Sequence, residues 1–116
     1  MNEKIEAVLQ KYERLLGDIW AVSMRYLGFF AVKLLVERVI WDVSKEYPEF
    51  GFLVFDESGI SFKRVREKLG EAENLPLEKM FDRFITRYIE ILAKLIGKDK
   101  VEEIEKELSE LSKEGE

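Results

Sequence analysis

The sequence predicts a mostly α-helical protein, a small bundle of four to five helices with a long central hydrophobic helix and at most a minor β element near residues 52–55. Two patterns carry this prediction. Residues 19–43 are apolar on nearly every side of a helix, which is typical of a helix buried centrally or against another chain. Residues 77–96 repeat their apolar side chains at the 3.6-residue period of an amphipathic helix. A chain of 116 residues buries roughly two thirds of its unfolded surface, so we expect one domain over residues 1–116.

The composition excludes several classes of function. The net charge of -5 does not suggest a nucleic-acid partner. There is no cysteine and no histidine, which removes disulfides, thiolate nucleophiles, imidazole bases and most transition-metal sites. We therefore expect no catalytic residues, no cofactor and no metal.

The balance of charged residues and the first residues of the chain bear on the organism and the compartment. Glu and Lys dominate the charged residues and side-chain amides are rare, a bias found in proteins of heat-adapted organisms. The charged first residues do not resemble a secretory signal, so we expect a cytoplasmic location.

The N-terminal region, residues 1–46, is predicted to be a long helix that bends or breaks, because the first proline is at position 48. An unbroken helix of that length would extend about 65 Å, whereas a compact domain of this size has a radius of gyration of about 14 Å. We place the break at residues 16–18, because glycine suits the position after a helix and Asp18 can cap the next one. Gly28 is the second candidate.

The middle region, residues 47–75, is predicted to be a connector of strand, turn and short helix. Its aromatic and branched run at 50–55 is typical of a short strand, and a turn-like sequence follows at 56–59. The next residues either pair back as a hairpin or let Ser61 cap a short helix over 62–69. We favour the short helix, with limited strand pairing.

The C-terminal region, residues 76–113, is predicted to form two helices. Pro76 suits the first turn of the first helix, and Gly97 ends it. Asp99 is predicted to open the last helix, with Glu102 three residues later as in a capping box. This helix has a narrow apolar stripe formed by Val101, Ile104, Leu108 and Leu111.

A stripe of mostly small residues along the hydrophobic segment is the candidate interface. It consists of Gly17, Ala21, Met24, Gly28, Ala31 and Leu35. Small side chains let another helix approach closely, so the stripe meets either the 77–96 helix or its own copy across a two-fold axis. Large aromatic residues elsewhere on the segment leave more apolar surface than one helix can cover. We therefore expect a homodimer, with another protein as a further partner.

A transmembrane role for the same segment is disfavoured. Arg25 and Lys33 would each cost ~2.5 to 3.5 kcal/mol near the centre of a bilayer. Lys33 is instead expected to extend its charge to water or to pair with Glu37 one turn away.

Aromatic residues around this segment provide a candidate apolar pocket. They are Trp20, Phe29, Phe30, Trp41, Phe52 and Phe55. Helical bundles build apolar ligand sites between facing helices, although core packing explains the same residues.

Charged groups give no catalytic or nucleic-acid motif. Three groupings of two carboxylates lie close together in the sequence: Asp56 with Glu57, Glu37 with Asp42, and Glu71 with Glu73. One segment is locally basic and contains Lys63, Arg64, Arg66 and Lys68. Asp in a turn is usually structural, and a recognition helix for DNA needs a basic surface that this acidic chain lacks.

The sequence therefore favours a non-enzymatic regulatory or adaptor module that acts through protein association, as a homodimer. The alternative is a sensor domain that binds an apolar small molecule in the aromatic pocket.

Overall fold

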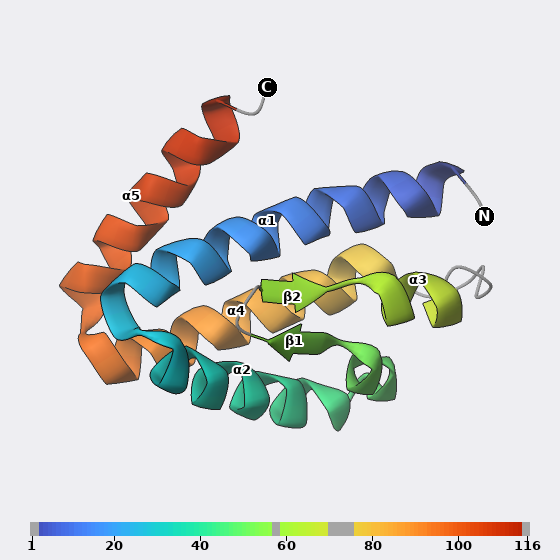
Figure 1. Cartoon of the computed structure of the whole chain (residues 1–116), viewed down its shortest axis with the longest axis horizontal. Coiled ribbons are helices and arrows are strands. Elements are labelled where there is room, and N and C mark those ends of the chain that lie inside the picture. The colour runs from blue at the N-terminus through green and yellow to red at the C-terminus, as the bar shows by residue number, and fades with distance from the viewer. Residues whose placement is uncertain (1–2, 57–58, 70–75, 115–116) are drawn as a thin grey trace.

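The computed structural model describes residues 3–56, 59–69 and 76–114 (Figure 1). Within these residues there are five α-helices and one two-stranded antiparallel sheet, which confirms the predicted fold class. The helices are α1 (Glu3–Leu27), α2 (Phe29–Ser44), α3 (Lys63–Leu69), α4 (Leu77–Ile96) and α5 (Lys98–Glu114). A short 3-10 helix η1 (Pro48–Phe52) and the strands β1 (Val54–Asp56) and β2 (Gly59–Ser61) connect α2 to α3.

The helices are arranged around α4. In Figure 1, α1 and α2 run in roughly opposite directions from a sharp turn, and α4 packs against both of them. The β-hairpin lies between α1 and α2, with β2 against α1. Helix α5 crosses the end of the molecule at the α1–α2 turn, contacts α1 and α4, and then rises away from α1. None of the described helices is long and apolar enough to cross a membrane.

The hydrophobic segment breaks at Gly28, so the predicted break at residues 16–18 is wrong. Gly28 has φ 79° and ψ 166°, a conformation that side chains other than glycine rarely adopt. Its N–H donates to the carbonyl of Met24, and its own carbonyl accepts from Val32. Gly17 stays inside α1, because a continuous helix keeps the buried residues on either side of it, such as Leu16 and Ile19, on the face that meets the core.

The buried side chains form one hydrophobic cluster with stacked rings around Phe81 of α4. Tyr12 of α1 and Phe62 stack on Phe81 with ring centroids 5.0 and 5.4 Å away. Phe50 of η1 meets Phe81 edge-on at 5.3 Å and stacks on Phe84 at 5.4 Å. The predicted apolar face of the 77–96 helix is therefore the face that holds the other elements together.

The connector combines both arrangements that the sequence left open. Val54 pairs with Ser61 and Asp56 pairs with Gly59, so a short hairpin forms. The Ser61 hydroxyl also accepts a hydrogen bond from the Lys63 N–H at 3.3 Å, which caps the start of α3. Residues 48–52 form a 3-10 helix, contrary to the expected strand, because this turn inserts Phe50 into the core. The expected turn at residues 57–58 and the polar connection at 71–74 lie outside the described residues.

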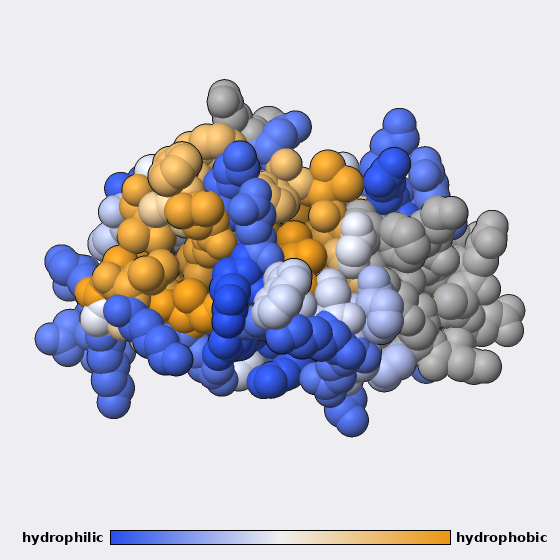
Figure 2. Space-filling model, turned by 90° about the horizontal axis from the view of Figure 1, so that it is seen from below, coloured by the Kyte–Doolittle hydropathy of each residue, from blue (hydrophilic) through white to orange (hydrophobic). Residues whose placement is uncertain are grey.

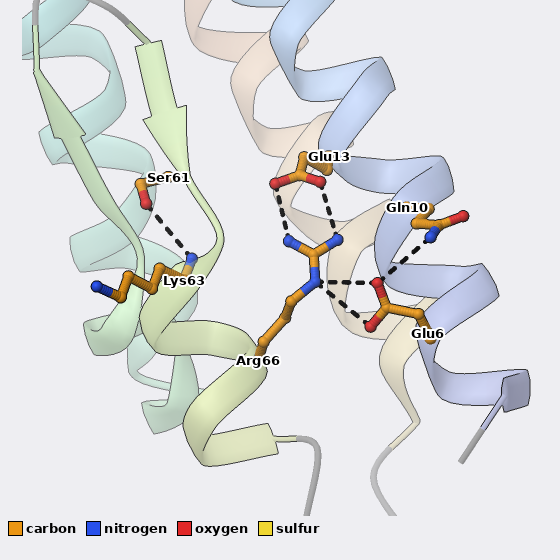
Figure 3. A network of polar contacts seen from close by, with 6 residues as sticks. All are labelled: Glu6, Gln10, Glu13, Ser61, Lys63 and Arg66. Carbon is orange, nitrogen blue, oxygen red and sulfur yellow. Dashed lines mark hydrogen bonds and ion pairs between the residues drawn. The ribbon is translucent and has the colours of Figure 1, made fainter. Parts of the chain in front are cut away.

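A network of charged side chains ties α3 to α1 (Figure 3). The two terminal nitrogens of the Arg66 guanidinium each donate to one carboxylate oxygen of Glu13 at 2.9 Å. Its Nε donates to Glu6 at 3.1 Å, and Gln10 donates to the same carboxylate at 3.4 Å. Bidentate pairing of this kind fixes both the position and the orientation of α3. The basic segment of the connector is thus partly committed to holding the fold.

The last helix begins at Lys98, so the prediction that Asp99 opens it is wrong. Gly97, with φ 91°, ends α4 by donating to Ala93 at 2.9 Å and starts α5 by accepting from Val101 at 3.2 Å. Asp99 consequently lies in the first turn of α5, where its charge is favourable for the helix dipole.

The two glycines of the N-terminal region, Gly17 and Gly28, should respond in opposite ways to alanine. At neither position does an added Cβ come within 4 Å of another group, so only the backbone conformation distinguishes them. Gly28→Ala should lower the free energy of unfolding by about 1 to 3 kcal/mol. Gly17→Ala should raise it by about 0.5 to 1 kcal/mol, because alanine favours a helix interior. Urea unfolding of both variants measures this, and an unchanged stability of Gly28→Ala would contradict the position of the break.

Candidate interaction surface

The outer face of α2 carries three large apolar side chains that the chain itself does not cover. Phe30 is 74% exposed, Leu34 52% and Trp41 57%. At 100° per residue these positions fall within about 40° of one line on the helix. We call these three residues the outer strip. Figure 2, which views the molecule from the side of α2, shows a broad hydrophobic area on this face with hydrophilic side chains beside it.

The outer strip is exposed because α2 is apolar on more than one side. Its inner face buries Val32, Val36 and Val39 completely and packs on α4 and η1. A single inner contact cannot cover a helix whose apolar residues extend around it, so the opposite side remains open to solvent. An exposed apolar area with a polar rim is typical of a binding surface.

Basic side chains flank the outer strip on both sides. Lys33 lies on one side of it, and Arg38 and Lys45 lie on the other. The Lys45 ammonium is 3.6 Å from the centre of the Trp41 ring, and the Arg38 guanidinium is 5.3 Å from it. Glu37 is the acidic residue within this face. The face is therefore locally basic in a chain whose net charge is -5.

The expected ion pair between Lys33 and Glu37 does not form. Both side chains are exposed, and no salt bridge joins them among those of the described residues. Both charges are thus available to a partner.

One carboxylate beneath this surface fixes α2 to α4. Asp42 accepts a hydrogen bond from the Arg87 Nε at 2.9 Å and one from Arg38 at 3.3 Å. Burial of Asp42 acts to raise the pKa of its carboxyl, but the hydrogen bond from Arg87 and the charges of both arginines outweigh it and lower the pKa. Arg87 also pairs with Glu90 of its own helix at 3.1 Å, and its pair with Asp42 at 2.8 Å links α2 to α4.

The six predicted interface residues do not form one stripe, because the break at Gly28 divides them between two helices. Three belong to α1, one is the break and two belong to α2: Gly17, Ala21 and Met24, then Gly28, then Ala31 and Leu35. Gly17 and Ala21 are exposed on α1, whereas Leu35 is buried in the core. The exposed apolar surface of this segment is the outer strip instead.

The predicted aromatic pocket is also divided. The Trp20 ring packs against Phe29 and Phe55, with centroids 6.3 and 6.0 Å apart, and Trp20 is 5% exposed. Phe30 and Trp41 lie on the outer strip. The side chain of Phe52 lies outside the described part of the structure. The structure thus brings three of the six residues together, in ring-to-ring contact.

A second apolar surface is a groove between α1, α4 and α5, with a volume of about 800 Å³. Aliphatic side chains form most of its lining: Leu15, Ile19, Ile85, Ile89, Ala93, Val101 and Leu108. Thr86, Glu90, Lys98, Glu105 and Ser109 supply its polar groups. This groove was not predicted from the sequence. The relevant signal is the apolar face of the 77–96 helix, which is wide enough to meet α2 on one side and to line a groove on the other.

The titratable groups of the core serve packing. The Tyr88 hydroxyl donates to Ser23 Oγ at 2.7 Å, and burial raises the pKa of Tyr88 to about 12. The Tyr12 hydroxyl donates to Asp82 at 2.6 Å, and burial together with that carboxylate raises the pKa of Tyr12. Both tyrosines therefore stay protonated at neutral pH.

The structure describes only part of the three carboxylate groupings. Glu57, Glu71 and Glu73 lie outside the described residues, and Asp42 is bound to arginines. The described residues contain no group of three or more His, Cys, Asp or Glu side chains that could hold a metal ion.

Comparison with known proteins found no matching family model, no similar characterised protein and no similar solved structure.

The Arg66 network should make stability depend on pH in the acid range. The hydrogen bonds from Arg66 lower the pKa of Glu13 from 4.5, against the opposing effect of burial. The unfolded chain therefore binds more protons at this site, and the stabilisation is lost as pH falls through the lowered pKa. Urea unfolding from about pH 7 down to about pH 3, a range that brackets an ordinary carboxyl pKa, should show stability falling below about pH 4.5, less steeply in Arg66→Gln.

The matched control for this experiment is Arg83→Gln. Arg83 forms an exposed ion pair with Glu46 at 3.6 Å, which should contribute little. A steep acid loss that is identical in wild type and Arg66→Gln would contradict the role given to Glu13.

Proposed function

We propose that this protein is a non-enzymatic regulatory or adaptor module that works by protein association through the outer strip of α2, with a second copy of itself as partner. The observation that supports the proposal is the exposure of Phe30, Leu34 and Trp41, each more than half open to solvent, on one line of a rigidly held helix.

The energetics of the outer strip favour an interface. Burying a side chain of this size contributes ~1.5 to 3 kcal/mol when it is fully covered, so three half-exposed ones contribute a few kcal/mol together. Tryptophan and arginine are enriched among the residues that dominate binding energy, and Arg38 lies beside Trp41. The inner face of α2 is locked on α4, so little conformational entropy is lost when the strip is covered.

We further propose that the protein works in the cytoplasm of a heat-adapted organism. Its Glu- and Lys-rich composition supports this, as do the arginine-centred networks at Arg66 and Arg87. Calorimetry should give an unfolding midpoint above the range of about 45 to 65 °C that is usual for mesophilic domains. A midpoint inside that range would remove the proposal of heat adaptation.

The association itself is tested by a charge placed on the outer strip. In sedimentation equilibrium, the mass of wild-type protein should rise with concentration above that of one chain. Leu34→Glu should hold the protein at one chain, because a buried unpaired carboxylate costs several kcal/mol. Its thermal stability should stay within about 0.5 kcal/mol of wild type, since Leu34 is exposed.

The chain supplies a matched control in Leu95, which is 58% exposed on α4. Leu95→Glu adds the same charge to a leucine of similar exposure and should associate as wild type does. A wild-type protein that stays at one chain throughout, or equal association of Leu34→Glu and Leu95→Glu, would sink the proposal.

A further inference from the structure

The groove and the outer strip are two open apolar surfaces on different sides of one molecule. In Figure 1, α2 runs along one edge of the molecule, while α5 rises on the other side of α1. The groove lies between α1, α4 and α5, and its aliphatic floor includes Ile85, Ile89 and Ala93 of α4. Because α2 is fixed to α4 by its buried inner face and by the Asp42–Arg87 pair, one chain cannot place its own strip in its own groove.

The two surfaces carry opposite charge. The outer strip is flanked by Lys33 and Lys45, and by Arg38, which pairs with Asp42. Among the described lining residues, the groove is bordered by Glu105 and by Glu90, which pairs with Arg87, against the cation Lys98. The sequence of α5 contains seven acidic and four basic residues. Glu105 has no ion-pair partner among the described residues. A convex apolar helix with basic flanks thus has its complement in a concave apolar groove with an acidic border.

We propose that the groove between α1, α4 and α5 receives the outer strip of a second copy, so that the chain associates head to tail. This inference rests on the proposed function and specifies which surface of the partner the strip meets. The apolar side chains of the strip cover the aliphatic floor, and Lys33, Arg38 or Lys45 approaches Glu105. Helix α2 of the second copy thereby lies beside α1, α4 and α5 as a fourth helix. Amphipathic helices commonly dock in this way, with the apolar face in a hydrophobic groove.

Charge makes a two-fold contact between the strips of two copies less favourable. Such a contact brings Lys33, Arg38 and Lys45 of one copy close to the same residues of the other, with Glu37 as the opposing charge. The groove presents carboxylates to the same cations. The head-to-tail contact also leaves one strip and one groove free on every pair, so association continues past two chains or closes into a ring.

The test uses two variants that each remove one half of the contact. Leu34→Glu blocks the strip, and Ala93→Arg both fills the groove and repels the basic flanks. Each variant alone should stay at one chain in size-exclusion chromatography with light scattering. Their equimolar mixture should form a complex of two chains that grows no further, because one intact strip then meets one intact groove. Wild-type protein should grow past two chains or reach one closed ring as concentration rises.

A second groove variant covers the case in which Ala93→Arg does not fold. Glu105→Lys changes an exposed side chain and should weaken wild-type self-association at least ~3-fold, by reversing a charge at the border of the groove. The Leu95→Glu control should associate as wild type does. Circular dichroism establishes that each variant is folded.

The outcomes separate this inference from the proposed function. If Leu34→Glu abolishes association but Glu105→Lys and Ala93→Arg leave it unchanged and the mixture forms no complex, the strip meets another surface and the inference is wrong while the proposed function stands. If wild type never associates, both fail. If native mass spectrometry finds an apolar small molecule that is retained by Leu34→Glu and lost in Ala93→Arg, the groove holds that molecule and the inference is overturned.

Discussion

The structure depends on one backbone conformation, that of Gly28. The positive φ of this residue ends α1 and starts α2 in the opposite direction, so the apolar segment of residues 19–43 supplies the end of the first arm, the turn and most of the second arm of a helical hairpin. Without this reversal, a single helix over residues 3–44 would be about 63 Å long, whereas the longest extent of the molecule is 39 Å. With it, α4 packs against both arms, and the rings around Phe81 draw α1, η1 and the start of α3 onto one core. The same reversal turns the outer strip of α2 away from the core.

The fold could be predicted from the sequence where local signals and burial agree. The 77–96 helix has a strict apolar period, a proline at its start and a glycine at its end, and the structure has it at those residues. The break was misplaced because Gly17 and Gly28 carry similar local signals. Only the core distinguishes them, since residues on both sides of Gly17 must face the same partner. The 3-10 helix at residues 48–52 was missed for a related reason: its aromatic run favours a strand, and the burial of Phe50 overrides that preference.

The candidate site was less accessible to sequence reasoning. Phe30 and Trp41 were recognised as residues that one packing partner could not cover, but they were assigned to a pocket with Trp20 and Phe55. Which aromatic residues share a face depends on the direction of α2 after Gly28, and no local pattern encodes that direction. The groove depends in the same way on the angle at which α5 leaves Gly97 and rises from α1. The sequence carries one signal for the groove: the apolar face of α4 is wider than contact with a single neighbouring helix requires.

We propose that another chain covers the outer strip, and the fluorescence of Trp41 reports whether it does. Trp20→Phe leaves Trp41, which is 57% exposed, as the single emitter. Its emission should shift to shorter wavelength as protein concentration rises and return on dilution. It should stay unshifted in the double variant Trp20→Phe/Leu34→Glu. An emission maximum that is independent of concentration would contradict the claim that association covers α2.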